Sequence, residues 1–592
     1  MLISDAVAAA LSELGVDTVF GLVGSGNFRV TNALIANGAR FVAARHECGA
    51  ASMADGWARL TGRPGIVSVH QGPGLTNALT GITEAAKSRT PMVVLAADVA
   101  ASATRSNFRI DVAALATGIG AVPARLHSPG LALDDTVRAY RTAADERRTV
   151  ILALPLDVQA GEAQMPPAGT EGALGSLRSR LTGRRPRGAP GTGAGGPGGG
   201  RARGDGGEPP PSAAVAHLAQ AVGQARRPVF IAGRGARLAG ARADLEQLAD
   251  ACGALLATSA AAKGLFRGNP WDLDVSGGFA SPLAAELIRG ADLLVGWGCS
   301  LNMWTMRHGA LVGPDATVAQ VDIERDALGA HRPVDVKVVG DVAVTARQVA
   351  ALLAGQPAAP RGGQAEASFG RGSGGYRSEP LRERIAAEVR WRDVPYDDQS
   401  DGVRIDPRTL SIALDDLLPA ERLVAIDSGN FMGYPSMYLS VPDADGFCFT
   451  QAYQSVGLGL SSAIGAAIAR PDRLVVAALG DGGALMGVSE LETAVRLGLG
   501  MVIVVYDDEA YGAEVHHFGP DGFPLDTVRF PPVDIAAIGR GFGCGAARVR
   551  QRADLAPLRD WLDGPRERPF LVDAKVVSDR GSWWLEEAFR GH

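Results

Sequence analysis

The chain has 592 residues and a formal net charge of −6, from 58 Lys and Arg against 64 Asp and Glu. At about 100 to 200 residues per domain, this length excludes a single core and predicts three or four domains. The basic residues are dispersed outside one Gly/Pro-rich stretch. We therefore expect no nucleic-acid partner.

The cysteines and the apolar runs indicate where the protein works. The five cysteines have neither paired nor metal-ligand spacing, which is typical of a reduced cytoplasm. The amino terminus is amphipathic, contains Glu13 and lacks a basic leader, and no apolar run reaches the about 18 residues of a membrane span. The sequence predicts a cytoplasmic protein without a membrane partner.

Composition marks the domain boundaries. Residues 166–211 are rich in Gly, Pro and Arg and carry too few apolar residues to order themselves, so they are predicted to be a flexible linker. Their arginines leave contact with an anionic partner open as the less favoured interpretation. Residues 356–380 form a second predicted linker, which precedes a helix. Beyond that helix, Asp406 and Pro407 predict a helix cap and the first turn of the next helix. Three predicted domains remain, at 1–165, 212–355 and 381–592.

The first predicted domain contains a strand that runs into a helix over residues 41–59, with Glu47 near the start of that helix. A glutamate at a helix start commonly only stabilises the helix dipole, and from the residues alone this interpretation of Glu47 stays open. A second strand is predicted at 65–69. It is followed by His70, and then by a Gly-Pro-Gly turn that begins at Gly72.

The middle domain alternates predicted strands, at 228–232, 291–296 and 317–322, with helical stretches. This order predicts another parallel sheet. The loop that begins at Gly233 lacks the full dinucleotide fingerprint, so it is weak support for a bound nucleotide.

Two acidic clusters follow strands in the last domain. The apolar run 473–479 precedes Gly480-Asp481-Gly482-Gly483, and the apolar run 501–506 precedes Asp507-Asp508. Carboxyl ends of parallel strands meet at one edge of a sheet, where ligands bind. Magnesium takes carboxylate and phosphate oxygens, so Asp481 and Asp508 predict a metal-diphosphate site beside a helix amino terminus. A plain turn at Gly480–Gly483 is the alternative.

These motifs resemble the thiamine diphosphate enzymes, in the acetolactate synthase-like and benzoylformate decarboxylase-like group, over nearly the whole chain outside the linkers. The resemblance implies an α/β fold of three doubly wound parallel-sheet domains: pyrimidine-binding, central and diphosphate-binding. It also implies thiamine diphosphate and magnesium as cofactors, with Asp481, Asp508 and the carbonyl of Ala510 as metal ligands. The family typically carries Asn at the position of Asp508. The extra carboxylate should favour a divalent cation strongly.

The resemblance assigns further residues to the cofactor. In the family, the glutamate that matches Glu47 hydrogen-bonds the aminopyrimidine ring and promotes deprotonation of the thiazolium carbon. Val456 matches an apolar wedge that bends the cofactor, and ordinary core packing is the alternative for this residue. The implied cofactor-binding positions are Glu47, Gly72, Pro73, Asn77, Gly429, Asn430, Val456, Gly480, Gly482 and Gly483.

Family assembly and cofactor usage give two more expectations. The pyrimidine domain of one subunit meets the diphosphate domain of its partner, so the resemblance implies a homodimer at least, with a homotetramer as the alternative. FAD occupies the central domain of acetolactate synthases, whereas many relatives leave that domain empty. FAD is therefore not favoured here.

Two titratable residues depart from the acetolactate synthase pattern. Those synthases carry an apolar residue at Glu514 and a small hydroxyl residue at His70, where benzoylformate decarboxylase-like enzymes carry His. The pair suits proton transfer at the reacting carbon, with His516 or His517 as a further proton carrier. The alternatives are a surface Glu514 and a structural His70.

Together these features predict an enzyme acting on a small 2-oxo acid by decarboxylation or carboligation, a carboxy-lyase or an acetolactate synthase-like transferase. Two alternatives remain: a carbon-carbon lyase or ligase of the same family that does not decarboxylate, and a non-catalytic cofactor-binding paralogue.

Overall fold

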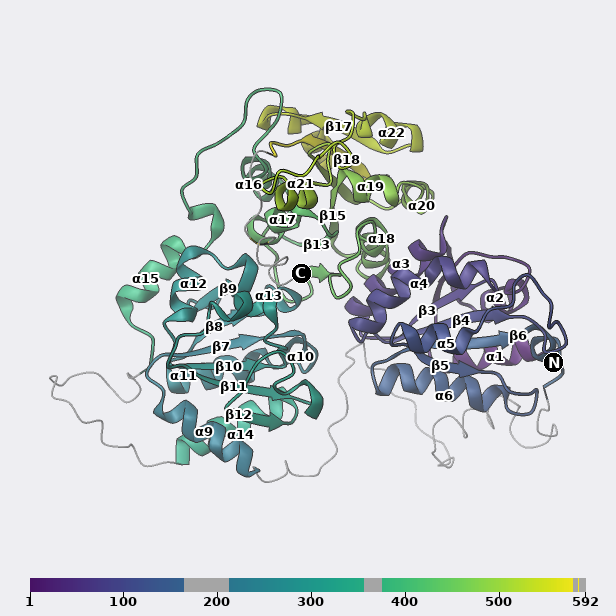
Figure 1. Ribbon diagram of the computed structural model, residues 1–592, viewed down its shortest axis with the longest axis horizontal. Helices are drawn as coiled ribbons and strands as arrows, with labels where there is room; N and C mark the ends of the chain where they lie inside the picture. The colour runs from purple at the N-terminus through teal and green to yellow at the C-terminus, as the bar shows by residue number, and fades with distance from the viewer. Residues whose placement is uncertain (164–211, 356–374, 579–583, 585–592) are drawn as a thin grey trace, which may run out of the picture. The chain divides into compact units, whose positions relative to one another are not determined.

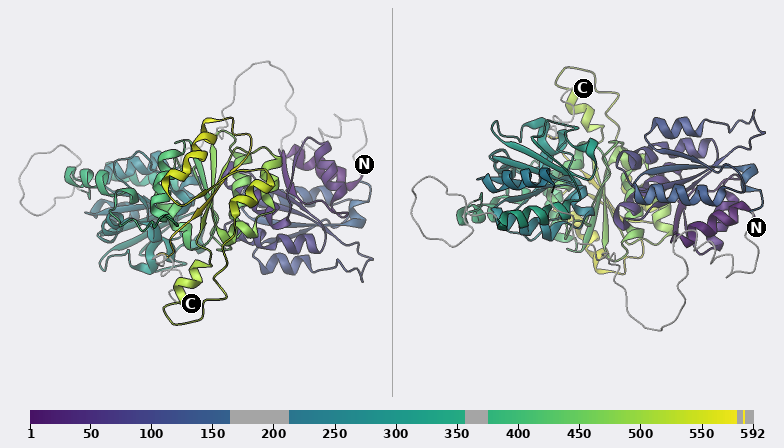
Figure 2. Two further views of the ribbon diagram at one scale, coloured as in Figure 1. Left: turned by 90° about the horizontal axis from the view of Figure 1, so that it is seen from above. Right: turned by 90° about the horizontal axis from the view of Figure 1, so that it is seen from below.

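The computed structural model describes residues 1–163, 212–355, 375–578 and 584 (Figure 1). It contains three six-stranded sheets in which every pair of neighbouring strands is parallel. Helices flank the sheets, as Figure 2 shows from two further directions. The first sheet belongs to one compact unit and the other two sheets to a second. The predicted fold class is confirmed.

The first sheet has the strand order β2-β1-β3-β4-β6-β5. Its central strands are buried at every position, as expected where helices cover both faces of a parallel sheet. The strands are β1 (Thr18–Gly21), β2 (Arg40–Ala43), β3 (Gly65–Val69), β4 (Met92–Asp98), β5 (Val122–Arg125) and β6 (Thr149–Pro155). The helices are α1 (Ile3–Glu13), α2 (Phe28–Ala36), α3 (Glu47–Thr61), α4 (Pro73–Lys87), α5 (Val112–Gly118), α6 (Ala132–Asp145) and α7 (Leu156–Gln159).

The middle sheet has the order β12-β11-β10-β7-β8-β9. Its strands are β7 (Pro228–Ala232), β8 (Leu255–Thr258), β9 (Asp272–Val275), β10 (Leu293–Trp297), β11 (Thr317–Asp322) and β12 (Val336–Val339). Its helices are α9 (Ala213–Gln224), α10 (Arg234–Leu238), α11 (Arg242–Cys252), α12 (Pro282–Arg289), α13 (Met303–Met306) and α14 (Val342–Gly355). Val229 packs into one core cluster and its neighbour Phe230 into another, because successive side chains of a strand point to opposite faces.

The third sheet has the order β14-β13-β15-β16-β18-β17, which repeats the order of the first sheet. Its strands are β13 (Arg422–Ile426), β14 (Phe447–Phe449), β15 (Leu474–Gly480), β16 (Val502–Asp507), β17 (Gly545–Val549) and β18 (Phe570–Lys575). Its helices are α16 (Pro407–Leu417), α17 (Gly433–Tyr438), α18 (Gly459–Ala469), α19 (Asp481–Met486), α20 (Glu490–Arg496), α21 (Gly512–Phe518), α22 (Ile535–Phe542) and α23 (Ala556–Asp563). Helix α15 (Glu379–Glu388), which precedes them, packs through Ile385 into a core cluster of the middle domain.

The shared strand order fixes where ligands can bind. In the first and third sheets the chain changes direction between the first strand and the third, which are β1 and β3 or β13 and β15. Loops leave the carboxyl ends of these neighbouring strands on opposite faces and open a crevice between them. The predicted site residues follow these strands or the adjacent strands β2, β14 and β16.

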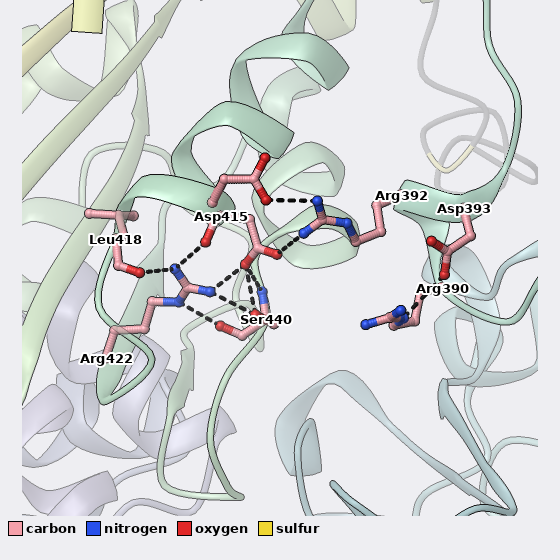
Figure 3. Close-up of polar contacts among 8 residues, drawn as sticks. Arg390, Arg392, Asp393, Asp415, Leu418, Arg422 and Ser440 are labelled. Atoms are coloured by element: carbon pink, nitrogen blue, oxygen red, sulfur yellow. Dashed lines mark hydrogen bonds and ion pairs between the residues drawn. The ribbon is translucent and has the colours of Figure 1, made fainter. Parts of the chain in front are cut away.

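A buried polar network secures the third domain at the start of β13 (Figure 3). The Arg422 guanidinium pairs with the Asp415 carboxylate and donates to the carbonyl of Leu418 at 3.2 Å. Ser440 donates from its hydroxyl to Asp415 at 2.7 Å, and Arg392 donates to the same carboxylate at 2.9 Å. A buried charge needs such partners. The network therefore ties α16 and the start of β13 to the segment that follows α17.

Most predicted elements are confirmed with small shifts. Asp406 caps α16 by accepting a hydrogen bond from the Arg408 amide, and Pro407 occupies the first turn as expected. The strand predicted at 291–296 begins later, at Leu293. Asp292 lies in the preceding loop because its carboxylate accepts from the amides of Arg226 and Arg227.

The predicted linker 166–211 and most of 356–380 lie outside the described residues, and the domain boundaries stay predictions. Within the described part of the chain, no helix is long and apolar enough to cross a membrane. The five cysteines all lie in the described residues, and no disulfide joins them. The cytoplasmic location stays a prediction.

Candidate functional site

The predicted site residues fall into two groups, one at the carboxyl edge of the first sheet and one at that of the third. The two groups belong to different compact units. Each group lies at the point where its sheet changes winding direction.

Glu47 and Asn77 meet in the first group. Glu47 begins α3 and is only 7% exposed, and Asn77 of α4 donates to its Oε2 atom at 3.1 Å. A Cβ atom on Gly74 would lie 2.9 Å from the Cβ atom of His70, so glycine permits α4 to approach. Stabilisation of the helix dipole alone does not require Glu47 to be buried and oriented by an amide. A carboxylate held in this way suits the predicted contact with an aminopyrimidine ring.

His70 bridges the loops after β1 and β3. Its Nδ1 atom lies 2.7 Å from the carbonyl oxygen of Gln71, and its Nε2 atom lies 3.2 Å from the hydroxyl of Ser25. A carbonyl only accepts, so Nδ1 carries a proton and Nε2 of the neutral ring accepts from Ser25. The ring packs edge-on against Phe108, with 5.2 Å between centroids. The sequence reasoning missed Ser25, which no motif marks.

The turn after His70 has the predicted shape. Gly72 has φ +64°, a conformation that favours glycine, and a Cβ atom there would lie 2.9 Å from the carbonyl oxygen of Phe108. Pro73 begins α4, where its missing amide hydrogen costs no helical bond. The turn thus brings backbone close to the crevice, as a bound cofactor ring would require.

Asp427 organises the second group. It follows β13, and its two carboxylate oxygens accept from the Gly457 amide at 3.1 and 2.9 Å. A Cβ atom on Gly483 would lie 2.2 Å from its Oδ2 atom, and one on Gly459 would lie 2.5 Å from its Cβ atom. Asp427 therefore holds the loops after β13 and β15 and the loop before α18 against one another. The sequence reasoning missed this role.

The electrostatics of Asp427 follow from its surroundings. Burial raises the pKa of its carboxyl to about 6, although hydrogen bonds from the amides of Ser428, Gly457, Leu458 and Gly459 oppose the rise. These four donors stabilise the ionised form. A carboxylate fixed in this way sets the spacing of the loops.

Val456 lies beside Asp427 and the glycines around it, and not in the core. Its side chain is 39% exposed, and a Cβ atom on Gly483 would lie 3.3 Å from its Cγ1 atom. The core interpretation of Val456 is wrong, because the loop around Asp427 presents the side chain at the surface next to α19. Its action as a cofactor wedge stays a prediction.

Glycines in the loops after β13 and β15 allow close approach of the backbone, because they carry no side chains. A Cβ atom on Gly429 or Gly480 would lie 3.2 or 3.1 Å from the Phe431 ring, and one on Gly482 would lie 2.9 Å from the Tyr511 ring. Gly480 immediately precedes α19, whose first residue is Asp481. A cradle of backbone at the carboxyl end of β15 fits a diphosphate.

Asp481 and Asp508 meet at the end of β15 and β16. Burial raises the pKa of Asp481 to about 8, and the charges of Asp508 and Asp507 add to the rise. Burial likewise raises the pKa of Asp508 to about 6, although Ser578 donates to its Oδ2 atom at 3.1 Å. A bound cation would stabilise the ionised form of these two buried carboxylates, which otherwise repel each other.

The donor set fits magnesium. No cluster of three or more His, Cys, Asp or Glu suitable for a metal occurs among the described residues. Asp481, Asp508 and the carbonyl of Ala510 would instead hold an ion together with phosphate oxygens, the kind of coordination that magnesium prefers. A Cβ atom on Gly512 would lie 2.4 Å from Asp508 Oδ2, and 3.2 Å from the Cβ atom of Asn430, which places Asn430 at this edge too.

Three of the predicted proton carriers, Glu514, His516 and His517, lie on α21 near Asp508. Glu514 is half-buried, two residues beyond Gly512. The Nε2 atom of His516 lies 3.4 Å from the Ser578 hydroxyl, which also bonds Asp508, whereas His517 packs edge-on against Phe518. His516 is thus connected to the predicted metal site. The meeting of Glu514 with His70 stays a prediction.

Comparisons with known proteins agree with this arrangement. Residues 1–115 match the N-terminal binding domain of the thiamine pyrophosphate enzymes, residues 215–349 match the central domain and residues 427–574 match the C-terminal binding domain. Thiamine pyrophosphate is another name for thiamine diphosphate.

Several curated relatives match over most of their length. The chain is 30% identical to a probable 2-ketoarginine decarboxylase of Pseudomonas aeruginosa, over 93% of this chain and 90% of the relative. It is 27% identical to an acetolactate synthase large subunit of Parasynechococcus marenigrum, with 96% and 87% covered. It is 25% identical to a sulfoacetaldehyde acetyltransferase of Castellaniella defragrans, with 86% and 82% covered.

Proposed function

Since the chain belongs to the thiamine pyrophosphate enzymes, we propose that it is a magnesium-dependent decarboxylase of a small 2-oxo acid, with carboligation as the second candidate. The observation that carries the proposal is the geometry at the end of β15 and β16. There Asp481 and Asp508 form a pair of buried carboxylates, both with a raised pKa, beside a glycine cradle. Such a pair suits a metal-bound diphosphate.

The residues of this chain have distinct roles in the proposal. Asp481, Asp508 and the Ala510 carbonyl hold magnesium, and the backbone at Gly480, Gly482 and Gly483 receives the diphosphate. Glu47, aligned by Asn77, holds the aminopyrimidine and takes part in its proton transfer. Thiamine diphosphate, when bound, supplies the electron sink for loss of carbon dioxide.

Proton delivery distinguishes the two candidate outcomes. His70 and Glu514 are proposed to deliver a proton to the carbon that loses the carboxylate, and that step releases an aldehyde. The Nε2 atom of His70 faces Ser25 and accepts in the neutral ring, so donation from this atom requires the doubly protonated imidazolium. The relative named as a decarboxylase supports this outcome, and the named synthase and acetyltransferase support carboligation.

A non-catalytic role and a bound FAD have less support. A non-catalytic paralogue would have no use for a buried Glu47 aligned by Asn77. FAD is not proposed for the middle domain, because the loop that begins at Gly233 after β7 lacks the full dinucleotide fingerprint. A homodimer is proposed as the smallest active assembly, in keeping with the family.

The proposal is tested by incubating the full-length protein with thiamine diphosphate, magnesium and a panel of 2-oxo acids. Carbon dioxide, aldehyde and ketol are measured for each acid. We expect carbon dioxide and aldehyde in equal amounts from at least one acid, and neither from the Asp481→Ala variant. Ketol without aldehyde favours the second candidate. No carbon dioxide from any acid, in protein that binds the cofactor, contradicts both.

A further inference from the structure

A buried lysine lies directly behind the predicted metal ligands. Lys575 is the last residue of β18, and only 8% of its side chain is exposed. Its ammonium pairs with the Asp507 carboxylate, lies 3.5 Å from Asp573 and 4.0 Å from Glu509, and donates to the carbonyl of Val533 at 2.9 Å. The buried ammonium offsets the negative charge of the three carboxylates around it.

The sheet itself sets the main contact. Strands β16 and β18 are parallel neighbours, and Asp507 lies opposite Lys575 in their register. Asp507 directly precedes Asp508 in the chain. Backbone pairing therefore fixes the distance between the lysine and the first residue of the segment that carries Asp508 and Ala510.

The segment beyond Asp507 has an unfavourable backbone conformation. Glu509 has φ +59°, in the left-handed region that a residue with a side chain seldom adopts. Arg404 forms an ion pair with the Oε2 atom of Glu509 at 2.7 Å, and the Lys575 ammonium lies 4.0 Å from its Oε1 atom. The backbone amide of Glu509 donates to the Asp507 carboxylate at 3.2 Å. Ionic contacts thus hold this residue in a conformation that its own preference opposes.

We propose that Lys575 is a positioning residue for the metal-diphosphate site. It neutralises Asp507 and fixes the turn from Asp507 to Ala510, so that the Asp508 carboxylate and the Ala510 carbonyl reach the same ion. Arg404 supports the same turn through Glu509. The inference rests on the proposed function, because it concerns how that site is held.

Removal of the ammonium has a specific consequence. Asp507 becomes a buried carboxylate without its cation, next to a metal ligand, and the turn loses one of the contacts that hold Glu509. Residues that support a metal ligand in this way typically change metal affinity by about 10- to 100-fold when removed. We therefore expect a raised magnesium requirement for cofactor binding.

The test uses the full-length protein and calorimetric titration with thiamine diphosphate across a series of magnesium concentrations. The Lys575→Met variant should need at least about tenfold more magnesium for half-maximal binding. The Lys575→Met/Asp507→Asn double variant lacks the unpaired charge and should recover most of this loss. Ser440→Ala is the control, because it loosens the Asp415 network of the same domain and should lower the melting temperature without changing the magnesium requirement.

Two further variants keep the test decisive if Lys575→Met fails to fold. Lys575→Arg retains the charge and Lys575→Gln removes it, so the arginine variant should need less magnesium than the glutamine variant. The reverse order overturns the inference, and so does a magnesium requirement that Lys575→Met leaves unchanged or that the double variant does not restore. A wild-type protein that binds no thiamine diphosphate in excess magnesium overturns the proposed function, and this inference with it.

Discussion

The side chain of Asn77 donates a hydrogen bond to the carboxylate of Glu47 across 3.1 Å and so joins the starts of α3 and α4. The Asn77 amide orients a buried carboxylate at the carboxyl edge of the first sheet. An oriented carboxylate in a mostly apolar setting is well suited to exchange a proton with a bound ring.

The first prediction concerns this carboxylate. Glu47→Gln keeps the size of the side chain and an oxygen that accepts from Asn77, but it removes the ionisable group. Deuterium exchange at the thiazolium carbon of bound cofactor, followed by NMR, should slow by at least about a hundredfold. Cofactor affinity, measured alongside as a control, should change much less. An exchange rate equal to that of the wild type would remove Glu47 from the proposed mechanism.

The second prediction concerns the metal. Asp481→Ala removes one of the two buried carboxylates at the end of β15 and β16. Thiamine diphosphate affinity should then fall steeply, because the diphosphate charge loses its metal bridge. Wild-type protein treated with a chelator should show the same loss. The metal assignment is contradicted if calorimetry finds that the Asp481→Ala variant and the chelator-treated wild type bind thiamine diphosphate as tightly as the untreated wild type.

The third prediction is a pH dependence. Without a cation the folded protein favours protonated Asp481, whose pKa is raised to about 8. Its contribution to stability is present below about pH 4 and is lost as the pH rises through about 8. Magnesium binds the ionised carboxylate of Asp481. At about pH 6 the ion must therefore displace a proton from Asp481, whereas at about pH 9 that proton has already dissociated.

The rise in melting temperature caused by magnesium with thiamine diphosphate should therefore be larger at about pH 9 than at about pH 6. Differential scanning fluorimetry at saturating cofactor measures it. In Asp481→Asn, which cannot titrate at this position, the difference between the two pH values should shrink. A larger rise at the lower pH would show that another group dominates.

The fourth prediction uses the contact between Gly483 and Asp427. Gly483→Ala places a Cβ atom 2.2 Å from Asp427 Oδ2, so the loops after β13 and β15 must move apart. Cofactor affinity should fall by at least about tenfold, the lower limit for a supporting contact in a metal site. Gly541→Ala is the matched control. Gly541 lies in α22 with nothing within 4 Å, and alanine there should stabilise the fold by about 0.5 to 1 kcal/mol.

The sequence predicts the sheets, and the sheet edge at which the candidate site residues lie, because both depend on local patterns. The apolar run 473–479 forms most of β15, which is buried from Leu474 to Leu479, and the acidic residue that follows lies at the carboxyl edge. The same reasoning placed Glu47 at the start of a helix and Asp406 at a helix cap.

Supporting contacts between distant segments could not be predicted in the same way. Asp427 is a single acidic residue after a strand, and only the folded chain shows that Gly457, Gly459 and Gly483 surround it. Lys575 meets Asp507 through the pairing of β16 with β18, across 68 residues of chain. Val456 was open between core and wedge because an apolar residue in a Gly-rich loop has no periodic pattern to decide its exposure.

The last prediction separates the two candidate reactions. If His70 and Glu514 deliver the proton that releases aldehyde, an apolar residue at either position should slow aldehyde release more than loss of carbon dioxide, which needs only the electron sink. An added acceptor aldehyde or 2-oxo acid then has longer to capture the activated carbon. The ratio of ketol to aldehyde should rise in His70→Ala and in Glu514→Leu, as chromatography of the products would show.

A matched control comes from the middle domain. His217 is an exposed residue of α9, and His217→Ala should leave the product ratio nearer to that of the wild type than His70→Ala does. A carboligase would respond differently, because its product already arises by capture and its pocket needs no proton donor there. Product ratios that stay flat in both the His70 and Glu514 variants would place these side chains outside the reaction and favour the carboligase.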